Sequence, residues 1–435
     1  MARKLVAAAV AVAVAAFFLL AVSGAAELHG GVRAPLLMTK ESRRSVVSTD
    51  AGSITSVDVN DDSRARGSYH LEFITMEPSS LFLPVLLHAD MLFYVHTGKG
   101  RVYTSVREDH EKERVEHMDV ERGDVSVVEK GSVFYVQSRP SPAEESLQIH
   151  LIFVTVDDEG NSEKASNEAY SIIGDLVHGF TAKILQKGFG VSEETIQAIK
   201  RVEKPPLIIP FLHNNEMMET HTWIRRITSN THDELANKNK KNKNKKFNFF
   251  KAKPDVENCN GWSTILTHKD LKALKSSHIE AFMVNLSKGS MTGPHWNPSA
   301  SEIAIVIHGQ GMVQVVCPNK APSETYQCKE TNFRVEEGDV VAVPRHRPMS
   351  HMSYNNGSLV LVGFSSITRK NLQWLAGKNS LLQTIDQEIL ALALNVPKSI
   401  VKDLMRSQSE PIILDCTSCA EKLEEKMEEE EVYEA

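Results

Sequence analysis

The chain has 435 residues, of which 41% are hydrophobic and 24% charged, and its formal net charge is −7. This composition is ordinary for a globular protein and excludes a wholly disordered chain, a collagen-like chain and a disulfide-rich scaffold. At roughly 150 residues per domain, the length predicts two or three domains. A net-acidic chain is a poor non-specific binder of nucleic acid, so no nucleic-acid partner is expected.

Residues 1–25 are typical of a secretory signal peptide. Arg3 and Lys4 precede an uncharged run rich in Ala and Val, which ends in small residues near Ala25. The run is close to the length of a membrane-spanning helix, so a signal anchor is the alternative. The small residues favour cleavage instead. No later stretch is long and apolar enough to span a bilayer, so we expect a secretory-pathway protein with no integral membrane segment after cleavage.

Two Asn-X-Ser triplets, beginning at Asn285 and Asn356, are candidate N-glycosylation sites and fit the secretory route. Asn285 falls within a predicted strand. The chain also carries an odd number of cysteines, which leaves at least one thiol over unless chains pair. They are Cys259, Cys317, Cys328, Cys416 and Cys419. Cys416 and Cys419 could form a redox pair, but their C-terminal position favours a local disulfide or two idle thiols.

The two halves of the chain resemble each other. The segment LFYVHTGKGRVYTSV, from Leu92, matches IAIVIHGQGMVQVV, from Ile303, and their glycine pairs align. Further on, VERGDVSVVEKG, from Val120, matches VEEGDVVAVPRH, from Val335. Apolar runs of strand length, separated by Gly and Asp turns, predict an antiparallel β-barrel in each half.

Each barrel pattern leads into helical spacing. Apolar residues recur at helical intervals from Ile173 to Ile184 and from Leu381 to Ile389. A second short helix is expected after each, since Ser192 suits an N-cap and Pro397 suits a first helical turn. We therefore predict a mainly β fold with two barrels, each followed by a helical extension.

These patterns divide the chain into six segments. They are the signal peptide 1–25, an N-terminal arm 26–67, the first barrel with its extension 68–210, a linker 211–260, the second barrel with its extension 261–415, and an acidic tail 416–435. Within the linker, residues 237–253 hold eight Lys and no acid. A solvated, disordered loop is favoured there, and a polyanion-binding patch is the alternative.

A spacing in the second half is similar to the first motif of the cupin superfamily. In that family, two His one residue apart and a later Glu point into the barrel and hold one metal ion. The matching residues here are Gly289, His295, Asn297, Glu302 and Gly309. Gly338 and Pro344 match the second cupin motif, in which Met349 stands where the metal-binding His would fall.

Only half of the cupin ligand set is therefore present. His295 and Glu302 remain, while Asn297 and Met349 replace the other two His. His351 could partly compensate, because it lies two residues beyond Met349 and would share its strand face. A divalent transition metal at His295, Glu302 and His351 is thus a candidate, and no other cofactor is expected. The alternative is that His295 is a hydrogen-bonded residue of a former site.

The corresponding positions of the first half hold no normal cupin ligand. They are occupied by Pro84, Leu86, Met91 and Phe134. All four suit a packed barrel interior, so the first barrel is predicted to hold no metal.

Taken together, the pattern resembles the vicilin-like seed storage globulins of plants, which are two-barrel (bicupin) proteins. The phrases PSASEIAIVIHGQGMVQVV, GDVVAVPRHRP and WLAGKNSLLQTID carry the likeness. The resemblance implies two double-stranded β-helix (jelly-roll) barrels and a non-catalytic role as a nutrient reservoir. It also implies a homotrimer built through the helical extensions, at Ile173 to Leu185 and Leu381 to Leu394. The implied location is the seed protein-storage vacuole or the cell exterior, with vacuolar proteases cutting the Lys-rich loop.

Two other functions remain open. One is a metal- or small-ligand-binding bicupin that uses the second barrel, with His295, Glu302, His351 and Cys317 as candidate contacts. The other, least favoured, is an enzyme resembling the oxalate-degrading cupins. Those enzymes need a complete set of three His and one Glu in a barrel, which neither half supplies.

Overall fold

The computed structural model describes residues 36–60, 68–106, 114–140, 143, 145–155, 169–211, 245–277, 279–316, 331–365, 372–406, 408–418 and 421. The predicted signal peptide, most of the acidic tail, Cys317 and residues 237–244 of the Lys-rich loop lie outside these ranges. No helix of the described residues is long and apolar enough to cross a membrane.

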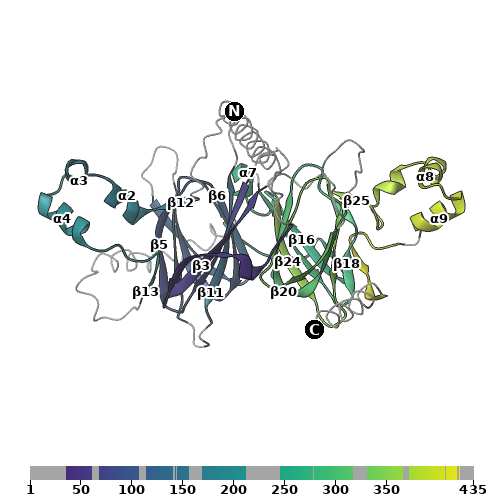
Figure 1. Ribbon diagram of the computed structural model, residues 1–435, viewed down its shortest axis with the longest axis horizontal. Coiled ribbons are helices and arrows are strands. Elements are labelled where there is room, and N and C mark those ends of the chain that lie inside the picture. Colours follow the sequence, from purple (N-terminus) through teal and green to yellow (C-terminus); the bar gives the residue numbers. More distant parts are fainter. Residues whose placement is uncertain are drawn as a thin grey trace, which may run out of the picture. The chain divides into compact units, whose positions relative to one another are not determined.

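The first barrel consists of two antiparallel sheets around one core (Figure 1). One sheet runs in the order β14 (Phe247–Asn248), β9 (Asp124–Val128), β6 (Asp90–Thr97), β11 (Leu147–Thr155), β4 (Ser68–Met76), β3 (Gly52–Asn60), β2 (Arg44–Thr49). The other runs in the order β12 (Tyr170–Ile172), β5 (Ser80–Leu87), β10 (Val133–Ser138), β7 (Lys99–Val106), β8 (Arg114–Glu121), with β13 (Ile208–Pro210) also on β5. Alternate residues of both sheets, such as Ile74, Phe93 and Phe134, point inward and are fully buried.

The second barrel follows the same plan, again with alternating inward residues such as Phe282, Val306 and Leu361. Its main path is β15 (Val256–Asn258), β16 (Gly261–Leu266), β17 (Glu280–Leu286), β24 (Leu359–Ser365), β20 (Glu302–Val315), β23 (Met349–Ser353), β18 (Ser290–Thr292), β26 (Ile413–Asp415). Further strands attach to this path: β1 (Leu37–Met38), β19 (His295–Trp296), β21 (Thr331–Glu336), β22 (Val340–Val343) and β25 (Gln373–Trp374). The predicted mainly β fold with two jelly-roll barrels is confirmed.

The aligned glycines of the internal repeat occupy equivalent positions. Gly98 and Gly309 adopt left-handed φ angles of 73° and 80°. A Cβ atom at Gly309 would lie 1.8 Å from the carbonyl oxygen of Ser358, so both the φ angle and the close approach require glycine. In the first barrel this glycine separates β6 from β7, whereas in the second it lies within the long strand β20.

A helical extension follows each barrel, as predicted. The first comprises α2 (Ile173–Gly179), α3 (Ala182–Phe189) and α4 (Glu193–Arg201), and the second η5 (Leu381–Thr384), α8 (Gln387–Leu394) and α9 (Lys398–Arg406). The single helical runs expected from Ile173 to Ile184 and from Leu381 to Ile389 are wrong. Extended backbone at Phe180 and Thr181 divides the first into α2 and α3, and extended backbone at Ile385 divides the second into η5 and α8. Ser192 caps α4 as predicted and accepts a hydrogen bond from the backbone N–H of Thr195.

The two barrels exchange short segments of chain. Strand β1 precedes the first barrel in sequence but pairs with β22 of the second. Strand β14 lies within the predicted linker, after the extension of the first barrel, but pairs with β9 of the first barrel. The predicted boundaries therefore need correction: the arm 26–67 contains strands β2 and β3 of the first barrel, and the linker 211–260 contains β14 and β15.

The outer sheet faces of the two barrels share a hydrophobic core, called here the junction core. It includes Tyr69, Leu71 and Phe249 on one side and Ile303 and Phe364 on the other. The rings of Tyr69 and Phe364 meet edge to face with centroids 6.0 Å apart. Burial of this apolar surface holds the two barrels together.

The described part of the Lys-rich loop is not a solvated loop, so that prediction is wrong for residues 245–253. Lys246 contacts the buried carboxylate of Asp124 at 2.6 Å, and Lys245 and Lys251 pair with Glu116 and Glu121. Phe249 is buried in the junction core. The segment is held because an apolar anchor and three ion pairs fix it on the first barrel. Lys253 is exposed, and the remaining four lysines, at 238–243, lie outside the described residues.

Among the described cysteines, Cys259 is a free, exposed thiol and Cys416 is disulfide-bonded. The partner of Cys416 lies outside the described residues, as does Cys419. The disulfide at Cys416 excludes an idle thiol at this residue, and the local disulfide with Cys419 stays a prediction.

Candidate ligand site in the second barrel

The predicted ligand residues lie on neighbouring strands inside the second barrel. His295 is on β19, Glu302 begins β20 and His351 is on β23. Each is between 2% and 3% exposed, which is unusual for ionisable residues and requires polar partners nearby. Strand register places His295 opposite Met349, two residues before His351, so the two His side chains share a strand face.

His295 is fixed in one tautomer. Its Nδ1 lies 2.8 Å from the carbonyl oxygen of Gly293, which can only accept, so Nδ1 carries the proton. Its Nε2 lies 3.8 Å from Oε1 of Glu302, a close electrostatic contact but too long for a hydrogen bond. Trp374 packs on the ring with centroids 4.7 Å apart.

His351 is held by Thr292. The backbone N–H of His351 donates to Thr292 Oγ1 at 2.9 Å, and the same hydroxyl lies 3.4 Å from His351 Nδ1. The His351 ring lies beside that of His295, with centroids 6.0 Å apart. The motif did not reveal Thr292 or Trp374, because each lies outside the cupin ligand positions.

The residues that replace cupin His ligands have other tasks. The Asn297 side-chain oxygen accepts hydrogen bonds from the backbone N–H groups of Ser299 and Ala300 at 2.9 and 3.0 Å, which closes a turn. Its Nδ2 is buried and has no hydrogen-bond partner among the described residues. Met349 belongs to the apolar barrel core. Neither side chain presents an oxygen or nitrogen lone pair to a metal.

The structure therefore brings His295 next to Glu302 and His351 but does not gather a metal-ligand set. Within the described ranges, no group of three or more His, Cys, Asp and Glu side chains could hold a metal ion. Cys317 lies outside those ranges. What the site offers is a buried polar patch with the imidazoles of His295 and His351 and the carboxylate of Glu302. Such a patch suits a small polar guest better than a transition metal.

In the first barrel, the four motif positions divide into two pairs. Met91 and Phe134 are fully buried in the barrel core, as predicted. Pro84 and Leu86 are half-buried and lie outside that core, so the prediction that all four fill the interior is wrong for this pair. On β5 the side chain of Val85 points inward instead, because the register of the pairing between β5 and β10 shifts in this region.

The two glycosylation candidates differ in accessibility. Asn356 is exposed in the turn between β23 and β24. Asn285 lies inside β17, half-buried, between paired residues of β16 and β24. Of the two, only Asn356 lies in an exposed turn, from which an attached glycan could extend into solvent without disturbing a sheet.

Comparison with known proteins places the chain in a family. The cupin family model matches residues 38–197 and 247–402. Two vicilin-like seed storage proteins of Arabidopsis thaliana are 41% identical over 404 residues and 38% identical over 416 residues. The matches cover 89% and 92% of this chain. The chain belongs to the cupin family as a two-barrel vicilin-like protein.

The lengths of these vicilin-like relatives differ from that of the chain. It spans 54% of the first relative and 78% of the second. Among solved structures, the vicilin of Solanum melongena, described as holding different anionic ligands in structurally similar pockets, matches with a TM-score of 0.70 at 17% identity. That match covers 89% of this chain and 99% of the other, and it supports the vicilin fold.

Proposed function

We propose that this vicilin-like chain is a non-catalytic seed storage protein, deposited through the secretory pathway in a protein-storage vacuole. The observation that carries the proposal is the extended similarity to proteins named as vicilin-like seed storage proteins, at 41% and 38% identity. The packing supports it, since both barrels are filled with buried apolar side chains. A storage protein must be compact and durable, and densely packed barrels meet that need without any chemistry.

The abundance and location of the protein in seed test the storage role. The protein would be measured by targeted mass spectrometry in maturing and germinating seed, together with immunogold localisation. A storage role requires abundance among the major seed proteins, labelling of protein bodies, and loss during germination. Low, constant amounts or labelling elsewhere would overturn it.

We further propose that the vicilin-like chain forms a homotrimer through its helical extensions. Both extensions expose large apolar side chains that the described part of the chain leaves uncovered. They include Phe180, Ile184 and Phe189 on the first and Ile389, Leu392 and Leu394 on the second, with exposed fractions from 47% to 77%. Exposed apolar surface of this extent marks a protein contact. A head-to-tail ring pairs the first extension of one chain with the second of the next.

A second candidate function is small-ligand binding at His295, Glu302 and His351. The observation that favours it is the buried Nδ2 of Asn297, two residues after His295 in sequence, which has no hydrogen-bond partner among the described residues. Elemental analysis of purified protein would detect a transition metal, and native mass spectrometry would detect a retained organic guest. A guest or metal that is lost in His295→Ala but kept in His268→Ala, an exposed control, supports binding. Neither guest nor metal in the wild type rejects it.

A further inference from the structure

Two histidines lie beside the junction core. His96 lies on β6 and His150 on β11, in the outer sheet face that packs toward the second barrel. Strand register places His150 between Phe73 of β4 and Tyr94 of β6. Neither histidine belongs to the cupin motifs, and nothing in the storage role uses them.

His150 lies in surroundings that suit only its neutral form. It is 8% exposed, and its Nδ1 has no hydrogen-bond partner in the described residues. The edge of Phe73 lies against its ring at a centroid distance of 4.9 Å, and the ring of His96 stacks on it at 5.1 Å. Two stacked imidazoles cannot both carry charge without strong repulsion.

The groups around the pair offer no acceptor for an added proton. The charged groups that act on the pair are Arg43 of the arm, Arg122 before β9, His308 of β20 and Glu337 before β22, of which only Glu337 favours a charged His96. Tyr94 of β6 contacts both rings, and Glu41 and Asp339 act on Arg43. Asp339 already accepts from two backbone N–H groups, and Glu337 is exposed and pairs with His308 at 3.4 Å. In the described residues, no hydrogen bond joins His96 or His150 to a carboxylate.

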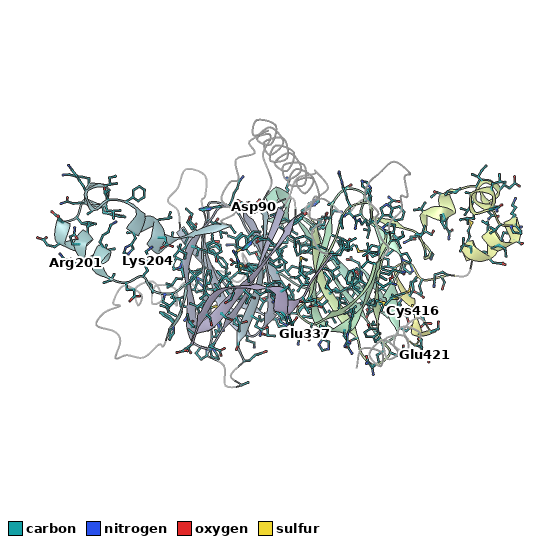
Figure 2. The ribbon with its side chains drawn as sticks, in the orientation of Figure 1. Asp90, Arg201, Lys204, Glu337, Cys416 and Glu421 are labelled. Carbon is teal, nitrogen blue, oxygen red and sulfur yellow. The ribbon has the colours of Figure 1, made fainter. Side chains whose placement is uncertain are left out.

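Arg43 connects this cluster to the second barrel. Its guanidinium lies 3.2 Å from the ring centroid of Phe73 and donates a hydrogen bond to the carbonyl oxygen of Gly338. Glu337, the residue before that glycine, is labelled in Figure 2. A cation at His150 would therefore be buried close to Arg43, at the place where the arm crosses between the barrels.

We propose that the stacked pair His96–His150 makes the junction between the barrels acid-sensitive. Protonation of either ring loosens the contacts that the first barrel makes with the N-terminal arm and with the second barrel. A buried cation without a partner costs more than local separation of a sheet face, which lets the imidazolium reach water. The junction is thus closed near neutrality and opens in acid.

The pKa directions agree with this geometry. Burial, followed by the nearby His96 and Arg43 charges, holds the pKa of His150 well below its ordinary value, and burial likewise lowers the pKa of His96. A lowered folded-state pKa means that the open state binds more protons below the ordinary value of about 6.5. The contribution of the neutral histidine pair to the stability of the closed junction is therefore fully present above about pH 6.5 and is lost as the pH falls below that value.

Hydrogen–deuterium exchange on the full chain tests the proposal. Between pH 7.5 and 5.5, after correction for intrinsic rates, protection of β1, β11 and β14 should fall by up to about tenfold, which is the effect of one proton that only the open state binds as the pH falls one unit below an ordinary pKa of about 6.5. Protection of β7, in the opposite sheet, should change less. The double variant His96→Phe, His150→Phe keeps the stacked rings without titratable nitrogens and should hold its protection at pH 5.5. His268→Gln, an exposed control, should behave as the wild type.

The proposal is overturned if protection of β1, β11 and β14 falls equally at pH 5.5 in the wild type and the double variant, or if it does not fall in the wild type. If the double variant does not fold, hydrogen–deuterium exchange at the imidazole C2 position of the wild type reads the pKa of His150 directly. A pKa at or above 6.5 there also overturns it, and a lower one supports it.

Discussion

Asp124 and Asp339 perform the same structural task in the two barrels. Each carboxylate accepts a hydrogen bond from the backbone N–H three residues earlier in its Gly-Asp turn, at 2.8 and 2.9 Å. Each carboxylate also binds a segment from outside its own barrel in sequence. Lys246 of the linker donates to Asp124 at 2.6 Å, and the backbone N–H of Lys40 in the N-terminal arm donates to Asp339 at 3.2 Å. The internal repeat therefore includes the crossing segments and not only the barrels.

Replacing Asp124 should destabilise the protein well beyond a surface substitution. Asp124→Ala removes the turn acceptor and leaves Lys246 without its carboxylate, so we expect a loss of about 2–3 kcal/mol in the free energy of unfolding, measured by urea denaturation. The control is Asp119→Ala. Asp119 is about half exposed and pairs with two arginines at the surface, so its loss should cost about 1 kcal/mol or less. Similar costs for both variants would contradict the role given to Asp124.

Limited trypsin digestion should distinguish the two ends of the Lys-rich loop. We expect the first cut among the lysines at 238–243 and protection of Lys245, Lys246 and Lys251, because these three are paired on the first barrel. The nicked protein should elute unchanged in size-exclusion chromatography, since β1 and β14 each cross to the opposite barrel. Early cleavage after Lys246 or Lys251, or separation of the two fragments, would show that the crossing segments are weakly held.

His70 should contribute stability in the direction opposite to His150. Burial lowers its pKa, but its hydrogen bonds to Glu72 and Asp58 outweigh burial and raise the pKa overall. A raised folded-state pKa gives stabilisation that is present below about pH 6.5 and is lost as the pH rises through the folded-state pKa. The stability difference between wild type and His70→Gln should therefore be larger at pH 5.5 than at pH 8.5. A difference that grows with pH would reverse the assignment.

The trimer is testable with one substitution in either extension. Leu392 is 77% and Ile184 56% exposed, so Leu392→Glu or Ile184→Glu should not disturb the fold of a single chain. In a head-to-tail ring each variant alters every interface, so light scattering coupled to size-exclusion should report monomers for both. Val115→Glu, at a 52% exposed position on β8, is the control and should remain trimeric. A monomeric wild type at micromolar concentration would reject the assembly.

Much of the candidate site was predictable because cupin spacing is a local property of strands. His295, Glu302 and His351 fall inside the barrel, as residues on shared strand faces must. The side-chain partners were not predictable, because they come from distant segments. Thr292 holds His351 across 59 residues, and Trp374 reaches His295 from β25.

The sequence by itself determined the two barrels, their helical extensions and the glycines at Gly98 and Gly309. Strand alternation, turn residues and left-handed backbone requirements all act over a few residues, so they can be read along the chain. Only the tertiary structure decided which barrel holds β1 and β14, how Lys246 is paired, and that His96 and His150 stack at the junction. Those contacts depend on which outer sheet faces meet, and burial of apolar surface favours such a contact without a local signature of its partner.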